Sequence, residues 1–156
     1  MLGLSAGGYD APRAAAFEKR FACAASFGGL CNLDTHRDMF LGRADQSSSE
    51  GLSDQRAHLR HVTGADTDEA AVAIYEKWTL EGVLDRINVP LLIAHGENDR
   101  QVPLWHAERT VAEAVNAPSA ELRVFTLAKG GADHCGLDNI TLQGDYVFDW
   151  LAKHLR

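Results

Sequence analysis

Three short motifs contain side chains that could do chemistry together, and the first centres on a serine. The chain reads Gly3-Leu4-Ser5-Ala6-Gly7, a G-x-S-x-G pattern. In this pattern the serine occupies a sharp, strained turn between a strand and a helix, which exposes its hydroxyl. Glycines two residues either side let strand and helix approach closely, and the N–H of Ala6 would donate to an oxyanion. A flexible Gly/Ser loop matches the same letters, so a nucleophile at Ser5 requires partners elsewhere.

The second motif could supply an acid. It runs from His95 to Pro103 and follows a continuous apolar run. In open α/β sheets, functional groups project from the carboxyl ends of strands. A carboxylate there could orient an imidazole and stabilise its charged form. We expect Asp99 to be this acid. Glu97 competes with it by position, and a surface turn rich in Asn and Asp is the structural alternative.

The third motif, Gly130–Cys135, places His134 on a loop after an apolar segment. A histidine on a loop that a rigid strand positions is a better candidate general base than one on a helix face. Cys135 is an alternative nucleophile, although a small packing residue is the simpler interpretation. We expect His95 to pack at a strand end and the other histidines to be solvated, namely His36, His58, His61, His106 and His154.

The order of the three candidates is informative. Ser5 comes first, Asp99 second and His134 last. This is the order of nucleophile, acid and histidine in the α/β-hydrolase fold, and it differs from the two other main families that use such a triad. The interval between Asp99 and His134 accommodates one helix, one strand and a loop. Order and spacing together indicate a serine hydrolase that forms a covalent acyl-enzyme with a carbonyl substrate.

The elements that would position these residues can be read from the hydrophobic pattern. The first part, residues 1–31, predicts a turn, a helix over Ala11–Arg20 and a strand over Phe21–Phe27. Pro12 should kink this helix or start a second helical piece, because proline removes a backbone donor.

The last part, residues 87–156, alternates between apolar runs and helical patterns, which favours an α/β fold with a parallel sheet covered on both faces. Its predicted elements are a strand over Val89–Ala94, a helix over Leu104–Val115, a strand over Leu122–Leu127 and a helix over Asn139–Leu155.

The middle part, residues 32–86, is polar and shows no strand signal. Ser47–Ser53 has the composition of a loop, and helical patterns flank it over Asp54–Val62 and Asp66–Ile87. We therefore predict one domain over 1–156, with a core formed by 1–31 and 87–156 and a helical cap inserted at 32–86.

Composition excludes several classes of function. The chain has 156 residues, 24% charged, with a net charge of −7 and no basic stripe, so we expect no nucleic-acid partner. No apolar run approaches the roughly 20 residues that a membrane span requires, and no leader peptide is apparent after Met1. Three cysteines without metal spacing indicate reduced thiols in a cytoplasmic protein. We expect a small-molecule carbonyl substrate, no cofactor and no metal.

The sequence also resembles a known group. Ser5–Tyr9 with Ala11–Arg20 resembles the elbow helix of the α/β-hydrolases related to dihydroxy-pseudo-oxynicotine hydrolase and to the polyketide-shortening hydrolases of fungal pigment pathways. The segments His95–Arg100, Asp133–Cys135 and Asp138-Asn139 are similar to the same group. The resemblance implies Ser5 as nucleophile, Asp99 as acid, His134 as base and a helical cap over the pocket. Members cleave carbon–carbon bonds next to a carbonyl, and relatives cleave esters.

The chain departs from this group at its start. Such proteins carry further N-terminal strands and the loop that supplies a second oxyanion donor, whereas Met1 stands only four residues before Ser5. We therefore expect a bare parallel edge on the sheet and hypothesise a truncated protein or a fragment. The alternative is a non-catalytic or inactive fragment that folds only with a partner or as a homodimer through that edge.

Overall fold

The architecture comes from a computed structural model that describes residues 1–32, 37 and 52–155. The chain divides into two compact units. The first unit combines Met1–Cys31 with Leu80–Arg156, and the second is Asn32–Thr79. All of the candidate chemical residues lie in the first unit.

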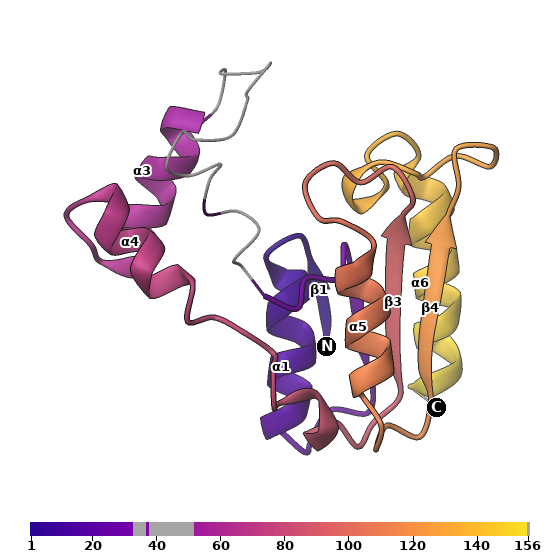
Figure 1. Ribbon diagram of the computed structural model, residues 1–156. Coiled ribbons are helices and arrows are strands. Elements are labelled where there is room, and N and C mark those ends of the chain that lie inside the picture. The colour runs from indigo at the N-terminus through magenta and orange to yellow at the C-terminus, as the bar shows by residue number, and fades with distance from the viewer. Residues whose placement is uncertain (33–36, 38–51, 156) are drawn as a thin grey trace. The chain divides into compact units, whose positions relative to one another are not determined.

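A four-stranded parallel sheet forms the centre of the first unit (Figure 1). The strands lie in the order β1-β2-β3-β4, with bounds Leu2–Leu4, Ala24–Phe27, Leu91–Gly96 and Ala120–Phe125. Every residue of β2 and β3 is buried, as expected for central strands covered on both faces. Because all four strands run the same way, the loops after β1, β3 and β4 all lie at the C-terminal ends of the strands. The predicted parallel α/β architecture is therefore confirmed.

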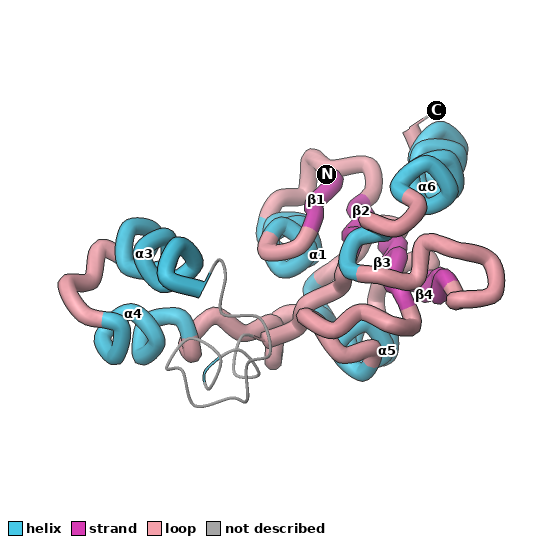
Figure 2. Tube along the Cα trace, turned by 90° about the horizontal axis from the view of Figure 1, so that it is seen from above, coloured by secondary structure: helices cyan, strands magenta, loops and turns pink. Residues whose placement is uncertain are grey.

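Helices cover both faces of this sheet. Viewed from above in Figure 2, α1 (Gly7–Phe17) and α5 (Trp105–Glu113) lie on one face, and α6 (Ile140–His154) lies on the other. Val147 and Trp150 of α6 pack against apolar side chains of the central strands, including Leu92. Two short 3₁₀ helices complete the unit, η2 (Leu84–Arg86) and η3 (His134–Gly136). No helix within the described residues is long and apolar enough to cross a membrane.

The first helix differs from its prediction. It starts before Ala11, ends before Arg20 and runs through Pro12 as one piece, so the idea of a second helical piece is wrong. Proline cannot donate to the carbonyl four residues earlier, which is that of Gly8. The buried hydroxyl of Ser26 on β2 donates to this Gly8 oxygen at 3.1 Å instead. The neighbouring strand thus supplies the hydrogen bond that Pro12 removes.

The predicted helix over Asp66–Ile87 is also wrong. The structure has α4 (Asp68–Tyr75), then a turn with Gly82 at a φ of 67°, and then η2. Leu80, Leu84 and Ile87 are fully buried in the first unit. Their helix-like spacing therefore reflects packing along a turn and η2, and the boundary between the two units falls after Thr79.

The described part of the second unit contains two helices joined by a turn. Its helices α3 (Leu52–Thr63) and α4 pack through Leu59, Ala71 and Val72. Arg60 pairs with Asp68 between the two helices. The helix predicted over Asp54–Val62 is confirmed with slightly wider bounds. The loop predicted over Ser47–Ser53 lies outside the described residues up to residue 51 and is helical from Leu52.

Candidate active site

Ser5 occupies a strained turn between β1 and α1. Its φ is 55°, a left-handed conformation that costs a non-glycine residue roughly 1–3 kcal/mol and that persists where the surrounding structure enforces it. Two backbone hydrogen bonds do so here: Ser5 N donates to Phe27 O at 3.0 Å, and Gly8 N donates to Ser5 O at 2.7 Å. The turn therefore presents the Ser5 hydroxyl at the carboxyl edge of the sheet, as the motif predicts.

The glycines that make this turn possible are not both those of the motif. A Cβ on Gly3 would lie 1.9 Å from Gly7 O, and a Cβ on Gly8 would lie 2.5 Å from Gly28 O. A Cβ on Gly7 would meet nothing within 4 Å. The close approach of helix and strand thus requires Gly3 and Gly8. Our assignment of that role to Gly7 is wrong, because the second contact lies one residue further along the helix.

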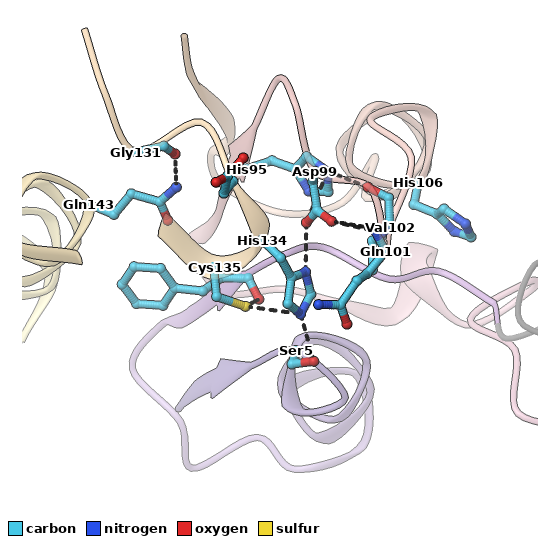
Figure 3. Close-up of polar contacts among 12 residues, drawn as sticks. Ser5, His95, Asp99, Gln101, Val102, His106, Gly131, His134, Cys135 and Gln143 are labelled. Atoms are coloured by element: carbon cyan, nitrogen blue, oxygen red, sulfur yellow. Dashed lines mark hydrogen bonds and ion pairs between the residues drawn. The ribbon is translucent and has the colours of Figure 1, made fainter. Parts of the chain in front are cut away.

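Three side chains distant in sequence meet at the C-terminal ends of the strands (Figure 3). His134 Nε2 lies 2.8 Å from Ser5 Oγ, and His134 Nδ1 donates to Asp99 Oδ2 at 2.8 Å. They come from the turn after β1, the loop after β3 and the loop after β4. Asp99 and His134 are buried, whereas Ser5 is half-buried. The three residues singled out by motif are therefore in hydrogen-bond contact.

Asp99 is oriented by its own loop. Its Oδ1 accepts hydrogen bonds from the N–H groups of Gln101 and Val102, both at 2.9 Å, which leaves Oδ2 for His134. The competing carboxylate, Glu97, instead accepts from Leu127 N at 2.6 Å. Of the two carboxylates we considered, the one in contact with the imidazole is that of Asp99.

Electrostatics favour charge separation within this pair. Burial acts to raise the pKa of Asp99, but hydrogen bonds from His134, Val102 and Gln101 outweigh it and hold the pKa below its usual value. Burial acts to lower the pKa of His134, but the hydrogen bonds to Asp99 and Cys135 and the negative charge of Asp99 raise it to about 9. An ionised Asp99 therefore stabilises an imidazolium at His134.

Ala6 follows the serine directly and precedes α1. It is exposed, and no described hydrogen bond uses its N–H. The positive end of the helix dipole lies at this position. The Ala6 N–H is therefore placed beside Ser5 and available to a negatively charged oxygen.

Cys135 packs beside the imidazole. It is buried, and its Sγ lies 3.5 Å from both His134 Nε2 and Phe27 O. Its φ is 51°, so the loop turns sharply just after the histidine. The thiol is thus a neighbour of His134 as well as a packing residue.

The remaining described histidines differ in their burial. His95 is buried at the end of β3, as expected, with Nε2 2.9 Å from Val102 O, and burial lowers its pKa. The prediction that His106 is solvated is wrong: the side chain is fully buried, with Nδ1 3.2 Å from Cys31 Sγ. His58 and His61 are exposed, His154 is half-buried, and His36 lies outside the described residues.

Sequence reasoning missed the contacts between the two loops. Asn98 N donates to Ala132 O and Asn98 Nδ2 donates to Asp133 Oδ1, both at 2.9 Å. Asp138 accepts hydrogen bonds from the loop that carries His134. Two signals were available: the similarity of Asp138-Asn139 to the group named above, and the abundance of Asn and Asp in these loops, which is equally typical of any surface turn.

A cavity of about 560 Å³ opens beside His134, of a size that accommodates a small organic molecule. The cavity is lined by Asn98, Arg100, Gln101, Leu127, Asp133, His134, Leu137 and Asp138. Among residues 1–32, 37 and 52–155, no cluster of three or more His, Cys, Asp or Glu side chains could hold a metal ion.

A parallel sheet flanked by helices, with a serine on a strained strand–helix turn in contact with a histidine and an aspartate, defines the α/β-hydrolase class. The family model of the prolyl oligopeptidase family matches residues 1–156, and the chain belongs to this family.

Similar proteins agree with this assignment. The chain is 32% identical to 2,6-dihydropseudooxynicotine hydrolase of Paenarthrobacter nicotinovorans over 97% of its own length and 38% of that protein. It matches a crystal structure of 2,6-dihydroxy-pseudo-oxynicotine hydrolase with a TM-score of 0.72 and 30% identity, over 99% of this chain and 39% of the other.

The α/β-hydrolase GrgF from Penicillium sp. sh18 matches with a TM-score of 0.65 over 98% of this chain and 62% of its own. At 18% identity this match shows the fold alone. The resemblance stated from the sequence is confirmed, and the chain spans about two fifths of the length of the curated relative that it matches.

Proposed function

We propose that this chain carries the catalytic residues of a serine hydrolase acting on a carbonyl compound, either an ester or a carbon–carbon bond next to a carbonyl. Ser5 is the nucleophile, His134 the general base and Asp99 the acid that orients it. The observation that carries the proposal is the continuous contact from Ser5 Oγ through the imidazole to Asp99, with 2.8 Å at each step. Relatives that are hydrolases support it.

The geometry supports a two-step reaction. His134 Nε2 takes the hydroxyl proton of Ser5 as Oγ forms a bond to the carbonyl carbon. The carbonyl oxygen becomes an oxyanion, which the Ala6 N–H binds. Collapse of this intermediate breaks the bond to the leaving group, an alcohol or an enolate, which takes the proton from His134. Water then attacks the acyl-enzyme, with His134 again as base, and releases the acid and free Ser5.

The second unit has a proposed role in this scheme. The helices α3 and α4 lie between β2 and β3 in the chain, where an insertion can carry a cap without disturbing the sheet. We propose that Asn32–Thr79 acts as a helical cap for the substrate pocket. The reaction as written uses no cofactor. Free cysteines at 23, 31 and 135 are consistent with a cytoplasmic protein.

The test of this function compares Ser5→Ala with the wild-type chain on a nitrophenyl ester and on a β-diketone. Ser119→Ala, which removes a hydroxyl from the turn before β4, is the matched control. We expect the Ser5 variant to lose activity on whichever substrate is turned over and the control to retain it. Equal rates for Ser5→Ala and wild type would rule out Ser5 as nucleophile.

The alternative is a non-catalytic chain that associates through its sheet edge as a homodimer. The observation that favours it is β1, which pairs with β2 and forms one of the two outer strands of the described sheet. An unpaired edge is a template for another strand. Mass measurement in solution together with the ester assay separates the two ideas. A folded monomer with esterase activity would count against the alternative, and an inactive dimer would support it.

A further inference from the structure

The loop that carries His134 has little regular structure of its own. Gly130 and Gly131 have φ values of 84° and 75°, and Cys135 follows the histidine at 51°. The two glycines give a free backbone access to many conformations, and the left-handed φ of Cys135 is a strained conformation that the surroundings must enforce. Something outside the local backbone must therefore select the one that directs His134 at Ser5.

The N–H groups of this loop converge on one carboxylate. Asp138 Oδ2 accepts from Gly131 N at 2.8 Å and from Ala132 N at 3.1 Å, and Asp138 Oδ1 accepts from Asp133 N at 2.9 Å. Three successive backbone donors thus point at the same anion just before His134. Hydrogen bonds to an ionised acceptor are roughly twice as strong as those between neutral groups.

The carbonyl side of the loop is held separately. Buried Gln143 on α6 donates from Nε2 to Gly131 O at 2.6 Å, and Asn98 N donates to Ala132 O at 2.9 Å. These contacts join the loop to α6 and to the loop that carries Asp99. Asp138 is itself exposed, so burial of apolar surface does not explain its position.

We propose that Asp138 is a positioning residue of the active site, whose carboxylate holds the backbone of residues 131–133 so that the His134 ring bridges Asp99 and Ser5. The inference rests on the proposed function for its catalytic consequence, but the geometry that it asserts can be tested without any turnover. The hydrogen bond from Asp133 N, together with those from Ala132 and Gly131, outweighs desolvation and holds the pKa of Asp138 below its usual value. The Asp138 carboxylate, which acts as a clamp on residues 131–133, therefore stays ionised at neutral pH.

Asp138→Asn is the sharpest variant. It keeps the size of the side chain but replaces one acceptor oxygen with an NH₂ donor, and either amide orientation sets that donor against at least one backbone N–H. Asp145→Asn is the matched control, because it removes the same charge from an exposed residue of α6. Asp138→Glu retains both oxygens and should restore part of the effect.

The experiment has a spectroscopic arm and a kinetic arm on the full chain. We expect the downfield NMR signal of the His134 Nδ1 proton, which reports its bond to Asp99, to weaken or broaden in Asp138→Asn and to stay unchanged in Asp145→Asn. We expect kcat on a nitrophenyl ester to fall on the order of 10-fold to 100-fold with little change in KM, because a small misplacement of the base costs rate. The His134 titration should shift to lower pH as its contact with Asp99 loosens.

Asp138→Asn with the kcat and His134 signal of the control would overturn the proposal. If the variant does not fold, amide exchange in the wild-type chain decides. The N–H groups of residues 131–133 should be protected relative to that of Ala128, which has no described hydrogen bond. Exchange as fast as at Ala128 would contradict the clamp. A wild-type chain without turnover but with the protected amides and the downfield signal would count against the hydrolase and leave the clamp supported.

Discussion

Two backbone segments, the turn that carries Ser5 (the serine turn) and the loop that carries His134 (the histidine loop), are held in place by different interactions. At the serine turn, backbone meets backbone, and Gly3 and Gly8 are required because a Cβ at either position would overlap a carbonyl oxygen. At the histidine loop, polar groups hold the chain, chiefly Asp138 and Gln143. Close packing of the backbone, together with two backbone hydrogen bonds, therefore positions Ser5, whereas hydrogen bonds to side chains and the charge of Asp138 position His134. The two regions should respond differently to substitution and to pH.

The largest expected effect comes from removing the charge that the histidine depends on. Asp99→Asn should lower kcat by about 10⁴-fold, the magnitude seen when a triad acid becomes an amide and the imidazole takes the wrong tautomer. The serine turn should remain intact, so the free energy of unfolding should change much less. Ester kinetics and urea unfolding measure both quantities. Glu97→Gln is the control, and a rate loss as large in that variant would reverse the choice of acid.

The next effect tests the role of volume at the serine turn. Gly3→Ala would place its Cβ 1.9 Å from Gly7 O, and we expect a loss of about 3 kcal/mol or more in the free energy of unfolding. Gly7→Ala meets nothing within 4 Å and should change stability by less than about 1 kcal/mol. Urea denaturation followed by circular dichroism compares the two. Similar losses at both glycines would contradict the assignment of the close approach to Gly3.

The pH dependence should come from the histidine. A general base acts in its neutral form, and the pKa of His134 is raised to about 9. The neutral fraction, and with it kcat/KM for an ester, should therefore rise by roughly fifty-fold between pH 7 and pH 9. Because this pKa lies above the unfolded value of 6.5, protonated His134 contributes stability that is fully present below pH 6.5 and is lost as pH rises through about 9.

A rate profile that is already flat above pH 7 would show that the imidazolium is not stabilised in this way. Asp99→Asn should move the rising limb of the profile to lower pH, because it removes the carboxylate that raises the pKa of His134. The Gly7→Ala variant at the serine turn should leave the midpoint unchanged.

The smallest expected effect concerns the hydroxyl of Ser26 on β2. Ser26→Ala removes the hydroxyl that donates to Gly8 O, the carbonyl that Pro12 leaves without a helical partner. We expect a loss of about 1–3 kcal/mol in the free energy of unfolding, the cost of an unsatisfied buried acceptor. In a Pro12→Ala background, which restores an N–H, the same substitution should cost less. Equal losses of stability in the two backgrounds would show that the Ser26 hydroxyl does not compensate for the N–H that Pro12 lacks.

Local patterns predicted most of the elements. The apolar runs placed β3 and β4 to within two residues, and the helical pattern placed α6 to within one at each end. The same reasoning failed over Asp66–Ile87, where Leu80, Leu84 and Ile87 mimic a helical stripe but pack from a turn and η2. It also failed for His106. Periodicity records which positions are buried, and a chain can bury the same positions with different backbones.

The amino-acid sequence by itself determined which chemical groups are present, their order, and the strands that carry them. Strands that run in parallel must end at one edge, so a serine, an aspartate and a histidine that follow such strands are brought to the same rim. Only the tertiary structure decided that Asp99 rather than Glu97 meets the imidazole, and that Gly8 and Asp138 support the site. Those outcomes depend on contacts between residues as far apart as Ser5 and His134, and the distance between such residues is set by packing and not by local pattern.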